Sequence, residues 1–353
     1  MSFTGNQILV TGAAGWLGSR LVRALAKGLP DYPQLGIPSS GMRIRCLILP
    51  GQNTSALRAL GTQIDTIQAD IRNPADCARF CSGAKNAVLF HTAGIIHPRR
   101  VAEFESINVL GCRNVLQAAS TAGVARAVVV SSNSPCGCNP HPDHVFDELS
   151  PYRPYMHYGR SKMQMESVVK EFQELGKIDT VVVRPPWFYG PHQPARQTLF
   201  FSMIRDGKAP IVGSGENLRS MSYVDNLCCG LILAALTPLA SGQVYWIADE
   251  RPYSMNEIVN TIERLLEQEF GHRCLHKRLR LPNLASQIAY GTDFLLQSLG
   301  LYHQKIHVLS EMNKTIACSI AKAKKELGYH PAIALEEGMR RSLSWCVEQE
   351  MSF

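Results

Sequence analysis

The sequence predicts an α/β protein, a doubly wound parallel sheet with a smaller lobe in its C-terminal half. Residues 7–10 form an apolar run that ends in a glycine turn, as a buried parallel strand does. Further apolar runs alternate with stretches of helical spacing, which is typical of such a sheet. We expect strands at residues 43–49, 66–69, 87–90, 127–130 and 180–183, and helices at residues 17–26, 101–122 and 161–174.

The length of 353 residues allows one large domain or a domain with an appended lobe. Strict alternation fades beyond about residue 186, so we expect residues 1–186 to form the nucleotide-binding domain, joined by a returning strand near 244–247. Residues 187–353 are expected to form mainly the substrate-binding lobe. The Pro/Gly-rich segment 28–41 exceeds the usual αβ connection and is expected to be a surface insertion, with a partner contact as the alternative.

The composition, with 45% hydrophobic and 18% charged residues, indicates an ordinary globular protein. The formal charge of +7 is spread along the chain, and the basic run 272–280 lacks interleaved aromatics, so we expect a solvated face and no nucleic acid. The chain opens without a secretion signal, and its 11 cysteines lack the paired spacing of a zinc site. We therefore expect a cytoplasmic protein without a metal. The uncharged run 226–248 looks like a helix, a turn and a strand rather than an integral membrane span.

Three glycines follow the first expected strand at spacing Gly-x-x-Gly-x-x-Gly. They permit a tight turn, close approach of the backbone to phosphates, and close packing of the next helix. The free N–H groups at the start of that helix would face a pyrophosphate. We therefore expect a dinucleotide in contact with Gly12, Ala14, Gly15, Trp16, Leu17 and Gly18.

The second expected strand ends without the carboxylate that usually binds the ribose 2′-hydroxyl. Arg58 and uncharged donors could instead accept a 2′-phosphate, so the cofactor is NAD or NADP, with a slight preference for NADP. Asp70 and Ile71 follow the third strand, where the carboxylate could accept the adenine amino group; an N-cap ahead of Asn73 is the alternative. Small residues after the fourth strand would let the backbone pass close to the cofactor. They are Thr92, Ala93 and Gly94.

A phenol and an ammonium stand four residues apart at Tyr158 and Lys162, about one helical turn. A lysine cation beside a tyrosine hydroxyl stabilises the phenolate and lowers its pKa from roughly 10 toward the range of a general acid/base. Together with the glycine turn, this pair indicates hydride transfer to or from an alcohol carbon.

In this order, the motifs resemble the extended short-chain dehydrogenase/reductase family, within the NAD-dependent epimerase/dehydratase superfamily. The segments that carry the likeness are residues 11–18, 70–71, 91–94, 131–132 and 158–162, with Asn108 between them. The resemblance covers nearly the whole chain and implies a Rossmann fold, a nicotinamide cofactor and an Asn-Ser-Tyr-Lys tetrad. The tetrad maps onto Asn108, Ser132, Tyr158 and Lys162.

The resemblance implies a role for each member of the tetrad. Tyr158 would exchange a proton with the substrate oxygen, which Ser132 would orient. Lys162 would hold the nicotinamide ribose, and Asn108 would anchor a water relay to it. The resemblance also adds Ser131 and Pro185 to the expected cofactor contacts. Family members commonly pair through the helices that carry Asn108 and Tyr158, which favours a homodimer.

Three departures bear on the branch of the family. Dehydratases carry an Asp-Glu pair after the catalytic hydroxyl residue, whereas this chain has Asn133 and Ser134, so dehydration is disfavoured. Nucleotide-sugar epimerases typically have an Asn where Trp187 stands, which favours a bulky apolar substrate; a structural tryptophan is the even alternative. Arg219 occupies the place of an arginine that meets a diphosphate in epimerases, but other branches share it. We expect Ser134, Trp187 and Arg219 to contact the substrate.

The C-terminal half most resembles the 3β-hydroxysteroid dehydrogenase-like branch, at residues 222–227, 281–285, 322–331 and 336–338. Residues 281–301 are apolar with small polar interruptions, and could line an oily pocket or touch a membrane surface. Asp293 within this stretch favours a packed core helix instead.

The sequence thus predicts an NAD(P)-dependent oxidoreductase that interconverts a secondary alcohol and a ketone on a lipid-like, steroid-like or β-hydroxy acid substrate. A nucleotide-sugar 4-epimerase with tightly bound NAD is the first alternative. A cofactor-sensing regulator without chemistry is the second, and it is disfavoured because Tyr158 and Lys162 are both present.

Overall fold

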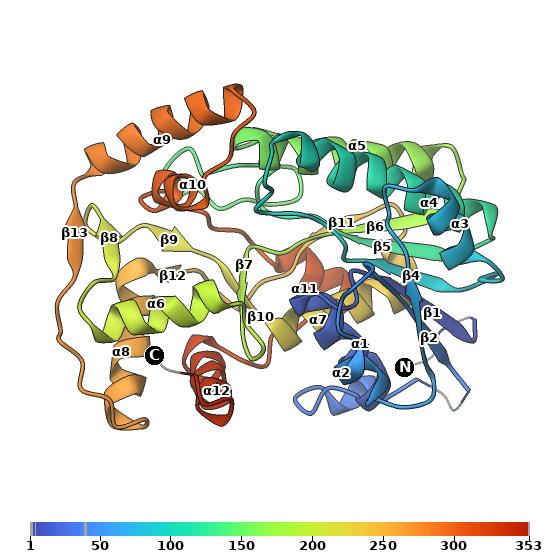
Figure 1. Ribbon diagram of the computed structural model, residues 1–353, viewed down its shortest axis with the longest axis horizontal. Helices are drawn as coiled ribbons and strands as arrows, with labels where there is room; N and C mark the ends of the chain where they lie inside the picture. The colour runs from blue at the N-terminus through green and yellow to red at the C-terminus, as the bar shows by residue number, and fades with distance from the viewer. Residues whose placement is uncertain (1–2, 4, 39–40, 352–353) are drawn as a thin grey trace.

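The computed structural model describes residues 3, 5–38 and 41–351, and its centre is a seven-stranded parallel sheet of order β3-β2-β1-β4-β5-β6-β11 (Figure 1). The order reverses between β1 and β4, which is where doubly wound sheets bind ligands. The predicted fold class is confirmed. The strands are β1 (Gln7–Thr11), β2 (Arg43–Ile48), β3 (Ile64–Gln68), β4 (Val88–His91), β5 (Arg126–Val130), β6 (Asp179–Arg184) and β11 (Val244–Trp246).

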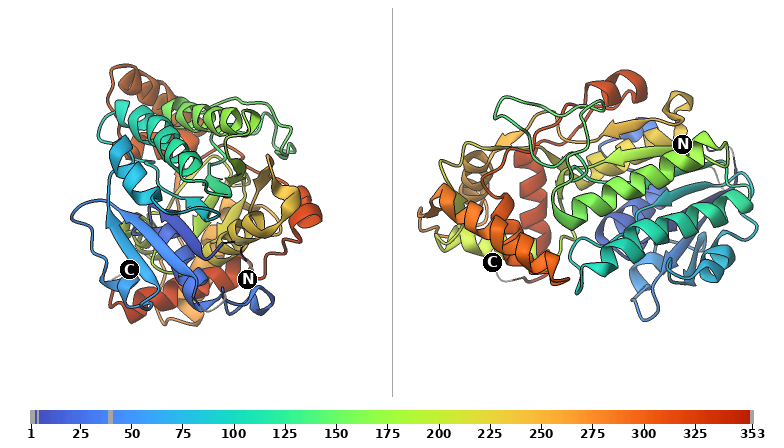
Figure 2. Two further views of the ribbon diagram at one scale, coloured as in Figure 1. Left: turned by 90° about the vertical axis from the view of Figure 1, so that its right-hand side faces the viewer. Right: turned by 90° about the horizontal axis from the view of Figure 1, so that it is seen from above.

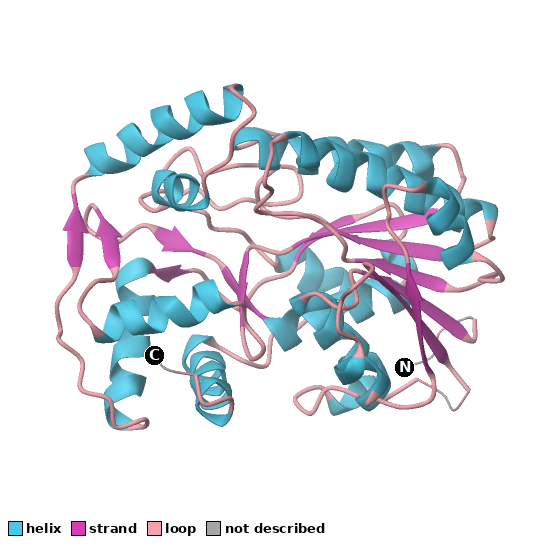
Figure 3. Cartoon of the chain, in the orientation of Figure 1, coloured by secondary structure: helices cyan, strands magenta, loops and turns pink. Residues whose placement is uncertain are grey.

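Helices cover both faces of the sheet (Figures 1, 2 and 3). Alternate residues of a strand point to opposite faces, so Ile8 and Val10 join one buried core while Leu9 joins the other. The first core takes in α1 (Trp16–Lys27), α7 (Val224–Leu236) and α11 (Ala321–Leu327). The second takes in α3 (Pro74–Cys81), α4 (Cys112–Thr121) and α5 (Met156–Glu174).

The strands expected from the sequence form within two residues of their predicted limits, and the strand near 244–247 returns to the sheet beside β6. Two helices differ from expectation. α5 begins at Met156, five residues before the predicted start, so Tyr158 and Lys162 share one helix. The continuous helix expected over 101–122 contains instead a π-helix, η2 (Phe104–Gly111), ahead of α4.

The segment after α1 packs more deeply than the expected surface insertion. Tyr32 is buried, and its hydroxyl donates to Asn226 Oδ1 at 2.6 Å and accepts from the Ala332 amide at 2.9 Å. Asp31 pairs with Arg341 at 2.6 Å. The short 3₁₀-helix η1 (Pro33–Leu35) also buries Leu35. The segment therefore ties α7 to the C-terminal part of the chain, although residues 39–40 lie outside the described residues.

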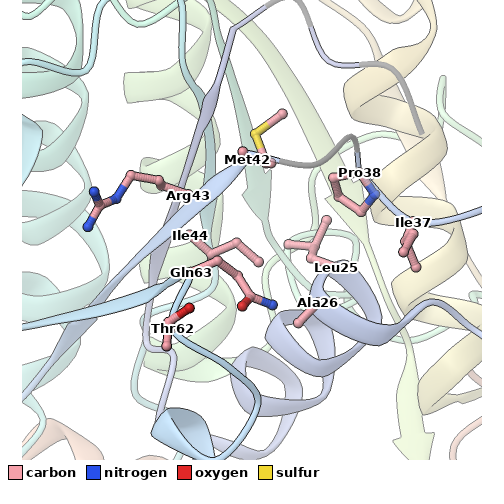
Figure 4. A pocket seen from close by; sticks show the side chains of 10 residues that line it. Leu25, Ala26, Ile37, Pro38, Met42, Arg43, Ile44, Thr62 and Gln63 are labelled. Carbon is pink, nitrogen blue, oxygen red and sulfur yellow. The ribbon is translucent and has the colours of Figure 1, made fainter.

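A shallow hollow lies beside this segment, between the end of α1 and the start of β2 (Figure 4). Ile37 and Pro38 form one wall, and Met42 and Arg43 form another. Parallel strands begin at this edge, so the hollow stands at the opposite end of the sheet from the carboxyl ends that carry the motif residues.

The second lobe has its own core, in which Ile258, Leu265 and Leu343 are fully buried. Among the described residues, every helix is too short or too polar to cross a bilayer. The lobe contains β7 (Trp187–Tyr189), α6 (Ala195–Arg205), β8 (Pro210–Val212), β9 (Leu218–Arg219), β10 (Met221–Tyr223), β12 (Tyr253–Ser254), α8 (Met255–Gln268), β13 (Leu279–Leu281), α9 (Asn283–Ser298), α10 (Gln304–Glu311) and α12 (Leu335–Glu348). The short elements α2 (Ser55–Arg58) and η3 (Pro238–Ala240) complete the chain.

Candidate active site

The turn between β1 and α1 requires its glycines. Gly12 has φ +68°, and a Cβ added there would lie 2.8 Å from the Ala93 backbone. A Cβ at Gly18 would lie 2.1 Å from the Gly12 carbonyl oxygen. Gly15 precedes α1, and no side chain caps the first turn of this helix. The first amides of α1 are therefore oriented to bind an anion such as a pyrophosphate.

Trp16 and Leu17, both expected to contact the cofactor, point in different directions. The Trp16 indole donates to the Pro191 carbonyl at 2.7 Å, and its ring centroid lies 4.6 Å from that of Phe188 in β7. Leu17 is buried in the core below the turn. Leu17 therefore offers a ligand its backbone, whereas Trp16 joins the glycine turn to the second lobe.

The end of β4 supports the glycine turn through Thr11. The Thr11 hydroxyl lies 2.8 Å from His91 Nδ1, and the Thr92 hydroxyl donates to the Thr11 carbonyl at 2.7 Å. Burial, and then the charge of Lys162, lower the pKa of His91 to about 3, so this ring is neutral. These bonds hold the strand ends on either side of the switch point together.

The structure corrects one alternative for Asp70. Asn73 caps α3 by accepting from the Ala75 amide at 2.9 Å, so Asp70 is not the N-cap. The Asp70 carboxylate instead binds Arg72 at 2.5 Å, and this contact lowers its pKa. The expected contact of Asp70 and Ile71 with an adenine stays a prediction.

Asn108 lies in the π-helix and is 1% exposed. Its Oδ1 accepts from the Ile95 amide at 2.8 Å, and its Nδ2 donates to the Ile95 carbonyl and to Ser161 Oγ, each at 3.0 Å. A Cβ on Gly94 would lie 3.2 Å from Asn108 Oδ1 and 3.5 Å from Lys162 Nζ. Asn108 and Lys162 thus face the same small backbone segment, and the absence of a side chain at Gly94 leaves room for both.

Lys162 is buried, with Nζ donating to the Val130 carbonyl at 3.0 Å. Burial lowers its pKa to about 8, while Cys112 and Glu166 act in the opposite direction. The ammonium is thus held at the carboxyl end of β5, on the side where Gly94 lies.

Tyr158 is 9% exposed and lies on α5. The net pKa of Tyr158 is not lowered, contrary to expectation. Burial raises the pKa of Tyr158 to about 12, opposed by the hydroxyl of Ser132. Nearby Ser134 is buried, and its hydroxyl lies 3.3 Å from that of Ser132.

Ser131, expected to contact the cofactor, directs its hydroxyl into a buried ionic cluster. Ser131 Oγ donates to Glu166 Oε1 at 2.5 Å, and Arg184 binds both oxygens of Glu166 at 3.0 and 2.6 Å. This cluster joins α5 to the ends of β5 and β6. Pro185, buried, follows directly.

The structure adds an aromatic group that the sequence reasoning missed. The Phe104 ring centroid lies 5.8 Å from that of Tyr158 and 5.8 Å from that of Tyr302. The Tyr302 hydroxyl lies 2.8 Å from His97 Nδ1. These residues come from three separate segments and share no motif with the tetrad. Their spacing in the sequence therefore does not predict that they meet.

The two other expected substrate residues lie in the second lobe. Trp187 in β7 is partly buried, and its ring centroid lies 6.1 Å from that of Phe200. Arg219 in β9 donates through Nη2 to the Glu311 carbonyl at 2.6 Å. Its buried Nε has no acceptor among the described residues. Arg219 thus keeps a free, buried donor at Nε.

Residues 8–248 match the NAD dependent epimerase/dehydratase family, and the chain belongs to this family. The chain is 53% identical to the uncharacterized protein y4nL of Sinorhizobium fredii, over 98% of this chain and 96% of that protein. It is 26% identical to 3beta-hydroxysteroid-dehydrogenase/decarboxylase isoform 1 of Arabidopsis thaliana, over 96% of this chain and 79% of that protein. The predicted family is confirmed.

The fold is also that of UDP-glucuronic acid 4-epimerase from Bacillus cereus, solved in complex with NAD. The TM-score is 0.75 at 21% identity, covering 98% of this chain and 100% of that chain. The family and these relatives identify the protein as an NAD-dependent enzyme of the dehydrogenase and epimerase class. The alternative of a cofactor-sensing regulator, disfavoured from the sequence, is not supported by these relatives.

Proposed function

We propose that the enzyme interconverts a secondary alcohol and a ketone on a lipid-like or β-hydroxy acid substrate. The observation that carries this proposal is the convergence of Tyr158, Ser132 and Lys162 at the carboxyl edge of the sheet, beside a glycine turn with uncapped amides. The glycine turn fits a dinucleotide pyrophosphate. When bound, a nicotinamide accepts a hydride from the alcohol carbon or returns one to the ketone.

The residues of this chain then manage the substrate oxygen. In alcohol oxidation, the Tyr158 phenolate removes the hydroxyl proton as the C–H bond breaks, and in reduction the phenol returns a proton to the carbonyl oxygen. The Ser132 hydroxyl donates to the same oxygen and fixes its position. The Lys162 ammonium stabilises the phenolate and holds the ribose, and Asn108 positions the backbone beside it.

Two features support an apolar substrate. Phe104 places an aromatic ring next to Tyr158 and in turn packs against Tyr302, and Trp187 stands where epimerases typically have a polar amide. The likeness to the 3beta-hydroxysteroid-dehydrogenase/decarboxylase of Arabidopsis thaliana agrees with this assignment. Asn133 and Ser134 replace the carboxylates that sugar dehydration needs.

Tyr158→Phe tests the chemistry. It removes the proton donor, and the rate of hydride transfer is expected to fall by a factor of about 10²–10⁴. The affinity for the dinucleotide should change little. Tyr290→Phe, at a tyrosine of α9 that is 44% exposed, is the matched control. Equal rates for Tyr158→Phe and the parent enzyme would contradict the assignment.

A nucleotide-sugar 4-epimerase is the second candidate, because the free donor of Arg219 could bind a diphosphate. The two functions differ in their redox balance. With 3-hydroxysteroids or β-hydroxy acids, a dehydrogenase accumulates reduced cofactor, which absorbance records. With UDP-hexoses, an epimerase forms the epimer without net reduction. Epimer formation in the absence of any turnover of hydroxysteroids and β-hydroxy acids would reverse our choice.

We further propose that NADPH binds at least as tightly as NADH. No carboxylate follows directly after β2, and the Arg58 side chain donates to Thr66 Oγ1 at 3.3 Å, its one hydrogen bond within the described part of the chain. Arg58→Ala should weaken the binding of NADPH and leave that of NADH unchanged, as measured by titration. We also propose that the protein is cytoplasmic and forms a homodimer, which pairs through α5 and the continuous segment of η2 and α4 and which sedimentation velocity would detect.

A further inference from the structure

Helix α9 buries a polar side. Ser286 and Asp293 have no exposed surface and Gln297 is 2% exposed. Ser286 Oγ donates to the Ser310 carbonyl at 2.8 Å, Asp293 Oδ2 lies 2.7 Å from His307 Nδ1, and Gln297 Nε2 donates to Asp293 at 2.9 Å. These bonds fasten α9 to α10, so the packed helix expected from Asp293 is present on this side.

The opposite side of α9 is apolar and exposed. Leu284, Ile288, Leu295 and Leu299 are 59%, 61%, 61% and 68% exposed. Their spacing of four, seven and four residues places them in one row along the helix, opposite the buried Asp293. Phe294 flanks the row and is 59% exposed, and Leu301 just beyond the helix is 53% exposed. We call these six residues the α9 face. A helix on a water-facing surface normally buries its apolar side and exposes its polar side.

The exposed charges around the α9 face are cationic. Between residues 279 and 308, Asp293 is the single acidic residue, and it is buried. Arg280 and Lys305 stand on either side of α9 in the sequence and are exposed. Arg100 pairs through its backbone with Leu301, which places Arg99 and Arg100 beside the α9 face. Within the described part of the chain, the guanidinium groups of these two arginines form no ion pair. The Glu103 carboxylate accepts from the backbone amides of these two arginines, at 2.7 and 3.4 Å.

We propose that the α9 face docks onto the surface of a bilayer that contains anionic lipids. Apolar side chains would enter the boundary between headgroups and acyl chains, and the surrounding Lys and Arg residues would meet the lipid phosphates. α9 has 16 residues, fewer than a membrane-spanning helix needs, so it lies along the surface. A symmetric pairing of two copies would instead set the same cations against one another. Figure 2 shows α9 at the outside of the molecule in the view from above.

One layer of side chains separates the α9 face from the candidate active site. The Gln297 side chain accepts from the amide of His157, the residue before Tyr158, at 3.2 Å. Tyr302 follows Leu301 directly, and Phe104 packs between Tyr302 and Tyr158. A lipid-like substrate would therefore have a short path from the bilayer. The docking itself is independent of the proposed function, because its test needs no turnover.

The test is flotation of the full-length protein with vesicles of phosphatidylcholine, with and without phosphatidylglycerol. We expect partitioning onto the anionic vesicles that weakens as salt is raised. Ile288→Gln and Leu295→Gln should each lower the partition coefficient about tenfold, since each removes an apolar side chain from the interface. Arg280→Gln with Lys305→Gln should lower it on anionic vesicles alone.

The matched control is Leu149→Gln with Leu239→Gln, because these leucines are 92% and 70% exposed on other elements. This pair should leave partitioning unchanged, and circular dichroism checks that every variant is folded. The proposal fails if the parent protein stays with the aqueous fraction, or if control and α9 variants behave alike. It also fails if sedimentation velocity shows that Ile288→Gln with Leu295→Gln dissociates a dimer while vesicles bind neither form.

Discussion

Lys162 is a buried cation, and no carboxylate of the described residues lies in hydrogen-bond contact with it. Its ammonium donates to the Val130 carbonyl and lies 3.6 Å from Met165 Sδ. Burial therefore dominates, and the pKa falls from 10.5 to about 8. Such a group disfavours the folded state of the protein by itself, which is a cost that functional sites commonly carry.

The first prediction concerns this cost. Lys162→Met should stabilise the protein at pH 7 by about 2 kcal/mol, because the charge is then absent from both states. The same variant should lose hydride transfer. In the parent protein, Lys162 is protonated in both states below pH 8. Between pH 8 and 10.5 the unfolded chain binds more protons than the folded one, so stability rises with pH. The difference in stability between Lys162→Met and the parent should therefore disappear between pH 8 and 10.5.

Urea unfolding at several pH values measures the effect. Lys170→Met, on the same helix but with a side chain 74% exposed, is the control and should not show it. If Lys162→Met were less stable than the parent at pH 7, other interactions of the ammonium would compensate for the cost of its burial, which would contradict the prediction.

The residue motifs of the site could be predicted, but the environments of these residues could not. The spacing of Tyr158 and Lys162 is local, so the sequence reveals it. The pKa of Tyr158 depends on burial, which α5, β5 and the second lobe create together. Ser131 likewise stands in a motif, but its hydroxyl reaches Glu166, 35 positions away, through tertiary packing.

At the scale of elements, the π-helix η2 has an identifiable cause. Asn108 holds both backbone groups of Ile95 and also Ser161 on α5. One side chain therefore joins the segment after β4, η2 and α5. A π-turn places such a residue where a regular helix would not, and π-turns are frequent at functional sites.

The second prediction follows from these three hydrogen bonds. Asn108→Ala leaves the partly buried N–H and C=O groups of Ile95 unpaired and should lower the free energy of unfolding by about 1–3 kcal/mol. The rate of hydride transfer should fall as well, since Gly94 and Lys162 lose their support. Thermal unfolding and stopped-flow absorbance record the two effects. Gln117→Ala on α4, whose amide bonds only Thr121, is the control. Unchanged stability in Asn108→Ala would mean that water replaces the amide.

The arrangement of α9 shows the limit of pattern reading for an element. The sequence predicts the helix and the burial of Asp293, and both are found. Which side of a helix packs is decided by its neighbours, here α10 with His307 and Ser310. The apolar row therefore faces outward, which hydrophobicity alone does not reveal.

At the scale of the whole molecule, the sheet and the second lobe share a polar centre. Asn226 on α7 accepts from Tyr32 and donates to Asp249 at 2.9 Å, and Asp249 accepts from Tyr189 of β7 at 2.8 Å. Burial raises the pKa of Asp249 to about 6, with four hydrogen bonds opposing it. The insertion after α1 thus connects to the second lobe through a buried network.

The third prediction tests this connection. Tyr32→Phe removes one hydroxyl and leaves the Ala332 amide without its acceptor, so the free energy of unfolding should fall by about 1–3 kcal/mol. The affinity for the dinucleotide should stay within a factor of about two, because the network lies away from the glycine turn. Urea unfolding and cofactor titration measure the two quantities, with Tyr290→Phe as the control. Loss of cofactor affinity without loss of stability would contradict a bracing role.

The overall fold was the most predictable level, because parallel strands buried on both faces are continuous apolar runs. The position of the insertion was predictable as well, but its burial was not. Tyr32 finds its partners about 194 and 300 residues further on, at Asn226 and Ala332. No local signal indicates such pairs.

The bridge from Trp16 to Pro191 gives the protein an internal optical probe. Indole emission depends on the polarity and hydrogen bonding around the ring. This indole stands at the end of the glycine turn, which we propose binds a pyrophosphate, and it donates to the second lobe. A change at either end alters its surroundings. With Trp187, Trp246 and Trp345 replaced by phenylalanine, fluorescence from Trp16 would report cofactor arrival and any movement of the lobe in one signal.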